Sequence, residues 1–298
     1  MIYTTEFKLV GGNREIFSEA FNEFPFMLYR AYDNTFVGNH VSWHWHPEFE
    51  ITLVSQGRLS FCTPGLNITL EKGEAVFINS NVLHEYQLLG ADTVIYSFLF
   101  SRDFLSGTRG SQIEKKYLFP VIADRNLKSR GLYPDGRAGM SMLQNLYEII
   151  DLCENEPFGY EFEIRGILGR FWCTLYDETS GSRSVSPPAH EEDSRRMQLM
   201  MEYIHEHYRE KMSVDEIAGA AGISGRECAR CFRRSIGMAP FEYVNDYRVR
   251  KAALALLATG DSILEISEST GFHSVSYFGK TFRGIMGCSP REYRTLQN

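Results

Sequence analysis

Two stretches near the carboxyl end of the chain repeat one another: SVDEIAGAAGISGRECARCFRRSIGMAPFEY begins at Ser213, and SILEISESTGFHSVSYFGKTFRGIMGCSPREY begins at Ser262. The offset between them is 49 residues up to Gly222 and Gly271, and it becomes 50 residues from Phe232 onward. About ten identities fall within roughly thirty aligned positions, which is more than chance produces. The last hundred residues are therefore expected to form two similar helical units.

Each repeat has the residue pattern of a helix-turn-helix. A serine can cap the first helix, and a glutamate three positions later can complete a capping box, at Ser213 with Glu216 and at Ser262 with Glu265. A glycine that can adopt the left-handed conformation ends this first helix, at Gly222 and at Gly271. The second helix is expected from about Gly225 to Gly237 and from about Ser274 to Gly287.

The second helix of each repeat has an apolar stripe and, opposite to it, a polar stripe. The apolar stripes are expected to face inward and consist of Cys228, Phe232 and Ile236, and of Phe278, Phe282 and Ile285. The polar stripes form exposed ridges of Arg226, Arg230 and Arg233, and of Ser276, Lys280 and Arg283. A single basic ridge is usually only a solvated face. Two of them, joined by a helical segment of ~27 Å, predict a reader of successive major grooves, which repeat every ~34 Å.

Charge is distributed unevenly along the chain, whose net charge is −7. Residues 1–189 contain 16 basic and 23 acidic residues, whereas residues 190–298 contain 15 of each. The segment from Arg226 to Lys251 holds seven basic and three acidic residues. The acidic balance of the whole chain therefore does not exclude a local phosphate-binding surface.

The last hundred residues resemble the DNA-binding domain of the AraC family of bacterial transcription regulators. The shared motif consists of Gly271, Phe272, Ser276, Tyr277, Phe278, Phe282, Arg283, Gly287, Ser289, Pro290, Tyr293 and Arg294, with Phe232, Gly237, Pro240, Tyr243, Arg248, Ala252 and Leu256 upstream. The resemblance implies base contacts at Arg226, Ala229, Arg230, Val275, Ser276, Tyr277 and Lys280. Arg233 is expected to contact phosphate, and Arg283 belongs to the second DNA-binding ridge.

The same resemblance implies three partners: double-stranded DNA, RNA polymerase and a small-molecule effector, with sugars considered first. Two positions depart from the family pattern, His273 near the start of the second recognition helix and Gly279 inside it. A glycine in a helix interior costs ~1 kcal/mol relative to alanine. We therefore expect the second helix to bind DNA more weakly than the first.

Residues up to about 100 are expected to form an antiparallel β domain, because short segments rich in β-branched and aromatic residues alternate with Gly, Asn and Pro. The expected strands lie within 40–54, 57–63, 67–73, 74–79 and 93–100. Apolar residues then repeat at helical spacing and predict helices at about 139–155 and 160–177. The apolar stripes of these helices suit the interface of a homodimer, or packing on the β domain.

The β region also contains a histidine motif. Gly38, His44, His46, Glu50 and Gly57 follow the pattern G-x5-H-x-H-x3-E-x6-G, which resembles the first motif of cupin barrels. The second cupin motif is matched only in part: Gly73 and His84 stand at the right separation, whereas the usual Pro, Gly and Asn are replaced by Asn79, Asn81 and Leu88. On a single strand the even-numbered His44, His46 and Glu50 would share one face, and a barrel could bring His84 and Tyr86 opposite them.

Three interpretations of this cluster stay open. Three imidazoles and a carboxylate can bind Fe, Mn, Zn, Ni or Cu, here through His44, His46, Glu50 and His84. The same side chains, together with Tyr86, can instead line a site for a small polar effector, and this interpretation is preferred. A structural role is the third.

These observations predict an α+β multidomain chain. A cupin-like effector-sensing and dimerisation domain is expected over residues 1–178, a polar linker containing Pro187 and Pro188 over 179–193, and an all-α double helix-turn-helix over 194–298. The leading hypothesis is a ligand-responsive transcription regulator that is not an enzyme and needs no cofactor. The alternative is a metal-dependent cupin enzyme, or a metal sensor, fused to a DNA-binding domain. Activation and repression are not distinguished.

Composition restricts the cellular setting. Hydrophobic residues make up 43% and charged residues 23% of the chain, which is typical of globular proteins. The sequence shows neither a signal-peptide pattern nor a run of about 18 apolar residues, so no membrane association is expected. Six cysteines without a disulfide framework suit a reducing compartment, and we expect the protein in the cytoplasm.

Overall fold

The computed structural model describes residues 2–3, 9–10, 14–15, 21, 23–32, 35–108, 110–124, 126–181 and 189–295. The chain divides into two compact units. The first unit comprises residues 1–8, 15–35 and 43–190, and the second comprises residues 9–14, 36–42 and 191–298. Each unit is described by itself.

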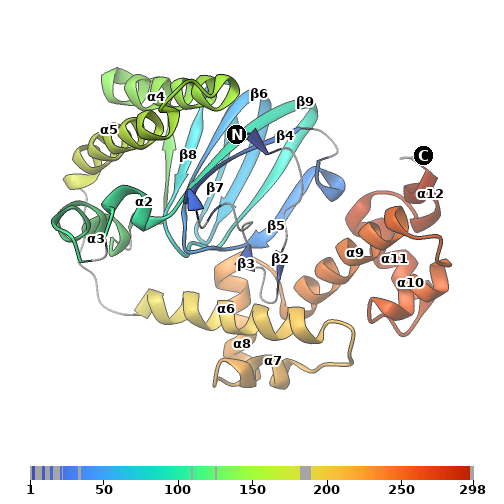
Figure 1. Ribbon diagram of the computed structural model, residues 1–298. Coiled ribbons are helices and arrows are strands. Elements are labelled where there is room, and N and C mark those ends of the chain that lie inside the picture. Colours follow the sequence, from blue (N-terminus) through green and yellow to red (C-terminus); the bar gives the residue numbers. More distant parts are fainter. Residues whose placement is uncertain are drawn as a thin grey trace. The chain divides into compact units, whose positions relative to one another are not determined.

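The first unit is built on a curved sheet of eight strands (Figure 1). The strands are β1 (Ile2–Tyr3), β4 (Phe26–Tyr32), β5 (His40–His44), β6 (Phe49–Thr63), β7 (Leu66–Glu71), β8 (Ala75–Ile78), β9 (His84–Phe100) and β10 (Ser129–Leu132), and of β5 only Trp43 and His44 are counted in the first unit. Their order is β1-β4-β9-β6-β8-β10, with β5 paired to β9 and β7 paired to β6. β1 runs parallel to β4, whereas the pairs β4–β9, β6–β7, β6–β8, β6–β9 and β8–β10 are antiparallel. The predicted antiparallel β domain is confirmed.

β6 is a single long strand where the sequence predicted two strands. The register between β6 and β9 shifts on both sides of Gln56, which marks a bulge. Gly57 adopts φ 73° at this point, and a Cβ atom there would lie 2.5 Å from Oγ1 of Thr93. The glycine thus bends the strand without ending it, which explains why a break was expected.

The two faces of the sheet differ in chemistry. Phe49 and Ile51 belong to the hydrophobic core together with Phe98 of the neighbouring strand. Glu50 and Thr52 alternate with these residues and therefore project to the opposite face. This second face, here called the inner face, holds the polar side chains of the candidate site.

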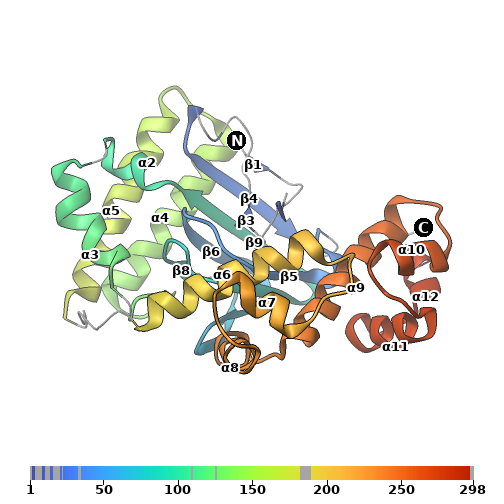
Figure 2. The same ribbon diagram turned by 90° about the horizontal axis from the view of Figure 1, so that it is seen from below.

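Helices cover the apolar face of the sheet. They are α2 (Arg102–Ser106), the π-helical turn η3 (Glu114–Leu118), α3 (Phe119–Ile122), α4 (Gly136–Asn155) and α5 (Tyr160–Ser180). α4 and α5 pack side by side, as Figures 1 and 2 both show. Leu146 of α4 and Leu168 of α5 are fully buried in the same core as Phe49.

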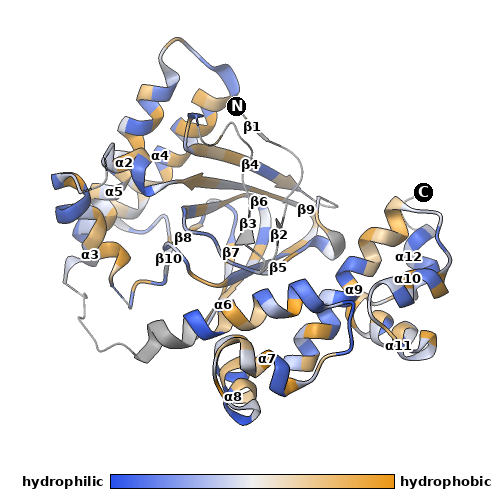
Figure 3. Ribbon diagram, turned by 60° about the horizontal axis from the view of Figure 1, so that its bottom comes forward, coloured by the Kyte–Doolittle hydropathy of each residue, from blue (hydrophilic) through white to orange (hydrophobic). Residues whose placement is uncertain are grey.

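This packing decides between the two expectations for these helices. The apolar stripes of residues 139–155 and 160–177 were expected either at a dimer interface or packed on the β domain, and they form the core of their own unit. The reason is physical: the apolar face of the sheet needs a cover, and two amphipathic helices that follow it in sequence supply one. Figure 3 shows hydrophobic and hydrophilic positions alternating along α4.

The second unit contains the helices α6 (Ala189–His207), α7 (Val214–Ala220), α8 (Gly225–Ile236), α9 (Pro240–Ala258), α10 (Ile263–Ser269), α11 (Val275–Met286) and α12 (Pro290–Thr295). It also includes β2 (Leu9–Val10), β3 (Arg14–Glu15) and the 3-10 turn η2 (Val37–Asn39). The pairs α7–α8 and α10–α11 are the two predicted helix-turn-helix units, and α9 joins them. The predicted helical carboxyl-terminal region is confirmed.

The helices of the second unit begin and end with the predicted capping residues. Capping boxes are present at Ser213 with Glu216 and at Ser262 with Glu265. Gly237 and Gly287 end α8 and α11 in the left-handed conformation, with φ 72° and φ 77°. Of the linker predicted over 179–193, residues 182–188 lie outside the described residues, while α5 extends to Ser180 and α6 begins at Ala189.

Candidate functional site

Helix α8 presents its arginine ridge to solvent. The Ser224 side chain caps the helix by accepting a hydrogen bond from the backbone N–H of Glu227. Cys228 and Phe232 are completely buried on one side of the helix. Because helical side chains at these spacings share one face, the opposite stripe must face outward. Three of the predicted DNA-binding residues are accordingly exposed, namely Arg226, Arg230 and Arg233, and Ala229 is half-buried.

Helix α11 repeats this arrangement. Phe278 and Phe282 are buried, and all five predicted DNA-binding residues are exposed: Val275, Ser276, Tyr277, Lys280 and Arg283. The hydroxyl of Tyr277 accepts a 2.9 Å hydrogen bond from Nδ2 of Asn245 on α9. α11 continues through Gly279 without a break. The unusual glycine therefore does not interrupt the helix.

Acidic side chains lie beside both ridges, and the sequence analysis missed them. Nη2 of Arg230 lies 2.6 Å from Oε2 of Glu227, one turn earlier on α8. Arg283 lies 3.8 Å from the carboxylate of Glu292 on α12. The i, i+3 spacing of Glu227 and Arg230 is a sequence signal that could have revealed the first pair.

The inner face of the sheet brings together the four side chains of the histidine motif. His44, His46, Glu50 and His84 are all at most 1% exposed. One ligand atom from each lies within 4.8 Å of the ligand atoms of the other three. Oε2 of Glu50 lies 3.1 Å from Nε2 of His46 and 3.1 Å from Nε2 of His84. We call these four residues the polar cluster.

The cluster forms from two strands and their connection, not from one strand. His44 ends β5, His46 lies in the connection, and Glu50 belongs to β6. The expectation that these three residues share one face of a single strand was therefore wrong. They still converge because β5 and β6 both pair with β9, whose first residue is His84.

Hydroxyl groups extend the cluster along the inner face. The Thr52 hydroxyl donates a 3.0 Å hydrogen bond to Oε1 of Glu50 and lies 3.0 Å from Oγ of Ser97. The Tyr86 hydroxyl lies 3.2 Å from Oγ1 of Thr52, and the Tyr86 ring packs 5.3 Å from the ring of His84. Burial opposes ionisation of Glu50, but the hydrogen bonds from His46 and His84 outweigh it and hold the pKa of this carboxyl well below its usual value.

The departures from the second cupin motif have local explanations. Asn81, which replaces the usual Gly, adopts the left-handed conformation at φ 59°, and Asn tolerates this conformation better than most residues. Nδ2 of Asn79 donates to the carbonyl groups of Val121 and Leu127. These hydrogen bonds hold the turn before His84 in place.

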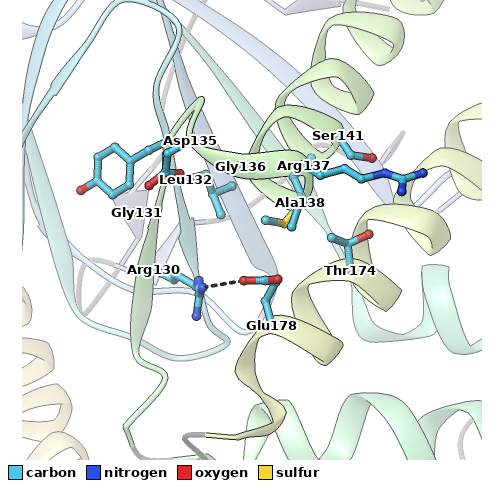
Figure 4. A pocket seen from close by; sticks show the side chains of 13 residues that line it. Arg130, Gly131, Leu132, Asp135, Gly136, Arg137, Ala138, Ser141, Thr174 and Glu178 are labelled. Carbon is cyan, nitrogen blue, oxygen red and sulfur yellow. Dashed lines mark hydrogen bonds and ion pairs between the residues drawn. The ribbon is translucent and has the colours of Figure 1, made fainter.

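A wider pocket lies outside the polar cluster, between β10, the start of α4 and the end of α5 (Figure 4). Nη2 of Arg130 faces Oε2 of Glu178 across it at 3.4 Å. An ion pair that is this exposed contributes under ~1 kcal/mol. The sequence analysis did not point to this pocket, and the polar cluster contributes none of the residues that line it.

Two family models match the chain, one in each half. Residues 29–169 match the AraC-like ligand binding domain, and residues 217–295 match a helix-turn-helix domain. The chain belongs to the AraC family. As a member of this family it is a DNA-binding transcription regulator with a ligand-binding domain.

Relatives extend over most of this AraC-family chain. It is 28% identical over 277 residues to the uncharacterized HTH-type transcriptional regulator YdeC of Bacillus subtilis (strain 168), covering 93% of this chain and 94% of that protein. It is 26% identical over 255 residues to the HTH-type transcriptional activator RhaS of Enterobacter sp. (strain 638), covering 84% and 86%. The solved structure of ToxT from Vibrio cholerae O395 aligns over 91% of this chain and 96% of that chain, with 13% identity and a TM-score of 0.46. The named relatives are transcription regulators, not enzymes.

Among the residues that the structure describes, none of the helices combines the length and the apolar character needed to cross a bilayer.

Proposed function

We propose that this AraC-family regulator reads a specific DNA sequence with α8 and α11, and that a ligand bound in the first unit controls this reading. The observation that supports the proposal is that α8 and α11 each present one exposed polar ridge. Each lies opposite a buried apolar stripe, so the fold itself directs the ridge outward. The proposed limits are a sensor over residues 1–178, a linker over 179–193 and a DNA-binding domain over 194–298.

The ridge residues divide into two roles. We assign base-edge contacts to Arg226, Ala229 and Arg230 on α8 and to Val275, Ser276, Tyr277 and Lys280 on α11. Arg233 and Arg283 lie further along their helices, and we assign them to phosphate. Base contacts set sequence preference, whereas phosphate contacts set affinity and its salt dependence.

The effector site is assigned to the inner face of the sheet, with His44, His46, Glu50, His84 and Tyr86 as its polar groups. The family resemblance places a carbohydrate or a related small metabolite first among effectors. Ligand binding can change DNA binding only through its different affinities for the active and inactive arrangements. This assignment predicts that the ligand stabilises the folded protein in a thermal melt.

A homodimer is the proposed assembly. With their apolar stripes buried, α4 and α5 leave Tyr147 and Phe162 exposed on the outer side, and Phe158 in the connection is fully exposed. Exposed aromatic side chains of this kind are enriched at protein interfaces. We further propose that the regulator acts in the cytoplasm, where it would meet RNA polymerase at its promoters.

Selection from a random pool of duplex DNA tests the proposed function. The full-length protein should enrich one motif with two half-sites spaced by about one helical turn, 10–10.5 base pairs. The variant Arg230→Ala should enrich a motif with relaxed preference at one or two positions. Enrichment of no motif by the folded wild-type protein would contradict sequence-specific reading.

A further inference from the structure

The two recognition helices begin alike but carry different side chains in their first turns. Both follow a capping serine, Ser224 or Ser274, so their residues correspond at an interval of 50. Arg226 of α8 thus corresponds to Ser276 of α11, which Val275 precedes. Arginine is the side chain that pairs with both acceptors of guanine in the major groove. Serine and valine have no such pair of donors, so the first turn of α11 must recognise a different group.

The apolar member of this first turn is Val275. It is the first residue of α11, and its side chain is 40% exposed. Valine has neither a donor nor an acceptor in its side chain, so its contact with a base edge must be apolar. The apolar group that bases present in the major groove is the methyl group at C5 of thymine. A helical valine holds one preferred rotamer, so little side-chain entropy opposes this contact.

Gly279 stands one turn after Val275, on the same side of α11. Its backbone does not adopt positive φ, and a Cβ atom at this position would meet nothing within 4 Å. Neither the backbone nor the packing of the protein therefore requires a glycine here, and an alanine would favour the helix. Glycine is common where the backbone approaches a ligand closely. α11 thus has room for a base edge beside Val275.

Val275 and Gly279 also line one wall of a hollow on the surface of the second unit. The other walls come from the first residues of α10, among them Leu264, and from the start of α12. Leu264 is an exposed apolar side chain. Both helices of the second helix-turn-helix therefore contribute apolar surface to this hollow.

A phosphate is the other DNA group that could enter the hollow. Ser262 and Ser289 line it, but their backbone N–H groups already donate to carboxylates. The acceptors are Oε2 of Glu265 at 2.8 Å and Oε2 of Glu292 at 2.7 Å. These donors are occupied, and the carboxylates repel a phosphate. Arg291, which also lines the hollow, is the side chain on which a phosphate would depend.

We propose that the start of α11 recognises the methyl group at C5 of thymine in the major groove. Val275 contacts the methyl group, and Gly279 leaves the space for the base edge that carries it. The proposal rests on the proposed reading of DNA by α11, and it names the base that this part of the helix selects. 5-Methylcytosine carries the same methyl group, whereas cytosine, guanine and adenine lack it.

Replacing thymine by uracil tests the contact, because it removes the methyl group and leaves base pairing intact. Each thymine of the motif selected by the full-length protein is replaced in turn, and the Kd of each duplex is measured in a gel shift. Burial of one methyl group predicts that one such duplex binds about fourfold more weakly. 5-Methylcytosine at that position should bind more tightly than cytosine does. Undiminished affinity for every uracil duplex would overturn the proposal.

The variant Val275→Ala tests which side chain meets the methyl group. It should bind the thymine duplex about as weakly as wild type binds the uracil duplex, and the ratio of its two Kd values should approach one. Val214→Ala makes the same change at the first residue of α7 and is the matched control. It should keep the wild-type ratio. Equal ratios in the two variants would overturn the role of Val275.

Two glycines inside α11 test the need for space. A Cβ atom at Gly279 or at Gly284 would meet nothing within 4 Å. Both Gly279→Ala and Gly284→Ala should raise the melting temperature, because alanine favours the helix. Gly279→Ala should nevertheless bind the thymine duplex severalfold more weakly and discriminate less between thymine and uracil, whereas Gly284→Ala should discriminate as wild type does. Equal discrimination by both variants would overturn the role of Gly279.

The same measurements separate this proposal from the proposed function. If the folded wild-type protein enriches no motif, both fail. A motif without thymine, or one whose uracil duplexes bind as tightly as the thymine duplex, overturns the thymine contact and leaves DNA reading intact. If uracil has no effect and Arg291→Ala flattens the salt dependence, the hollow holds a phosphate and the proposal is overturned.

Discussion

Gly271 lies directly against the main chain of Tyr208, so that a Cβ atom at position 271 would stand 2.3 Å from the Tyr208 carbonyl oxygen. The same oxygen accepts a 2.7 Å hydrogen bond from Nε of Arg248, and Nη2 of Arg248 donates to the carbonyl of Glu210 at 2.8 Å. Arg248 belongs to α9, which joins the two repeats. The segment after α6 is therefore fixed against the turn of the second helix-turn-helix.

Replacing Gly271 should accordingly be more damaging than replacing its counterpart in the first repeat. Both Gly271 and Gly222 have positive φ, at 84° and 65°, but a Cβ atom at Gly222 would meet nothing within 4 Å. Gly222→Ala should cost about 1–2 kcal/mol from backbone strain alone. Gly271→Ala adds a steric clash and should cost about 2–5 kcal/mol in total. Urea unfolding followed by circular dichroism measures both, and equal losses would contradict the packing.

The ion pair between Glu227 and Arg230 should tune DNA affinity. Glu227→Gln removes a negative charge beside the ridge and releases the Arg230 guanidinium, so affinity for all DNA sequences should rise severalfold. Stability should change by less than ~1 kcal/mol, because the pair is exposed. The matched control is Glu268→Gln, which makes the same charge change on α10. If both variants raise DNA affinity equally in a gel shift, the gain comes from the change in net charge and not from release of the Arg230 guanidinium.

His205 should make the second unit sensitive to acid. Its Nε2 lies 2.7 Å from the Tyr243 hydroxyl, and its ring stacks on Tyr247 at 4.0 Å. Burial, assisted by the charge of Lys251, holds the pKa of His205 well below its usual value. In the unfolded chain His205 binds a proton at a pH at which it stays neutral in the folded chain. The free energy of unfolding therefore falls as pH drops below the unfolded pKa of about 6.5.

Comparison with His205→Gln isolates this effect. The difference in unfolding free energy between wild type and variant should be constant above about pH 7.5 and should shrink below pH 6.5, by at most ~1.4 kcal/mol per pH unit. Chemical unfolding at a series of pH values provides the measurement. A pH-independent difference would show that His205 does not titrate differently in the folded state.

Two substitutions on α5 should affect folding stability and dimerisation separately. Leu168 is fully buried and Phe162 is 83% exposed. Leu168→Ala should cost about 2–5 kcal/mol of stability, whereas Phe162→Ala should change it by under ~0.5 kcal/mol. If the outer side of α5 forms the proposed dimer, Phe162→Ala should lower the mass measured by light scattering. An unchanged dimer mass would show that the dimer interface does not include Phe162.

Local signals in the sequence were sufficient for the helix-turn-helix units. Capping serines, their glutamate partners and terminal glycines act within a few residues, so α7, α8, α10 and α11 begin and end close to the predicted positions. Contacts that join distant segments gave no such signal. The hydrogen bond between Asn245 and Tyr277 depends on how α9 and α11 pack, and it was not foreseen.

The sequence predicted that the first domain is an antiparallel β domain, but it did not predict the limits of its strands. Alternation of apolar and polar residues indicated strands, yet the continuous β6 and the break between His44 and Glu50 depend on strand pairing across the sheet. The four residues of the polar cluster were correctly expected to lie together. Their mutual distances, and the carbonyl groups that orient His46 and His84, could be obtained only from the structure.

The affinity of the Arg230→Ala protein for the selected operator tests the central claim most directly. Arg233→Ala is the companion variant, since both residues lie on the exposed ridge of α8. In a gel-shift titration, Arg230→Ala should lose about 1–3 kcal/mol of binding free energy and discriminate less at one or two base pairs. Arg233→Ala should weaken all sequences alike and flatten the salt dependence. Unchanged operator binding by both variants would contradict the assignment of this ridge to DNA.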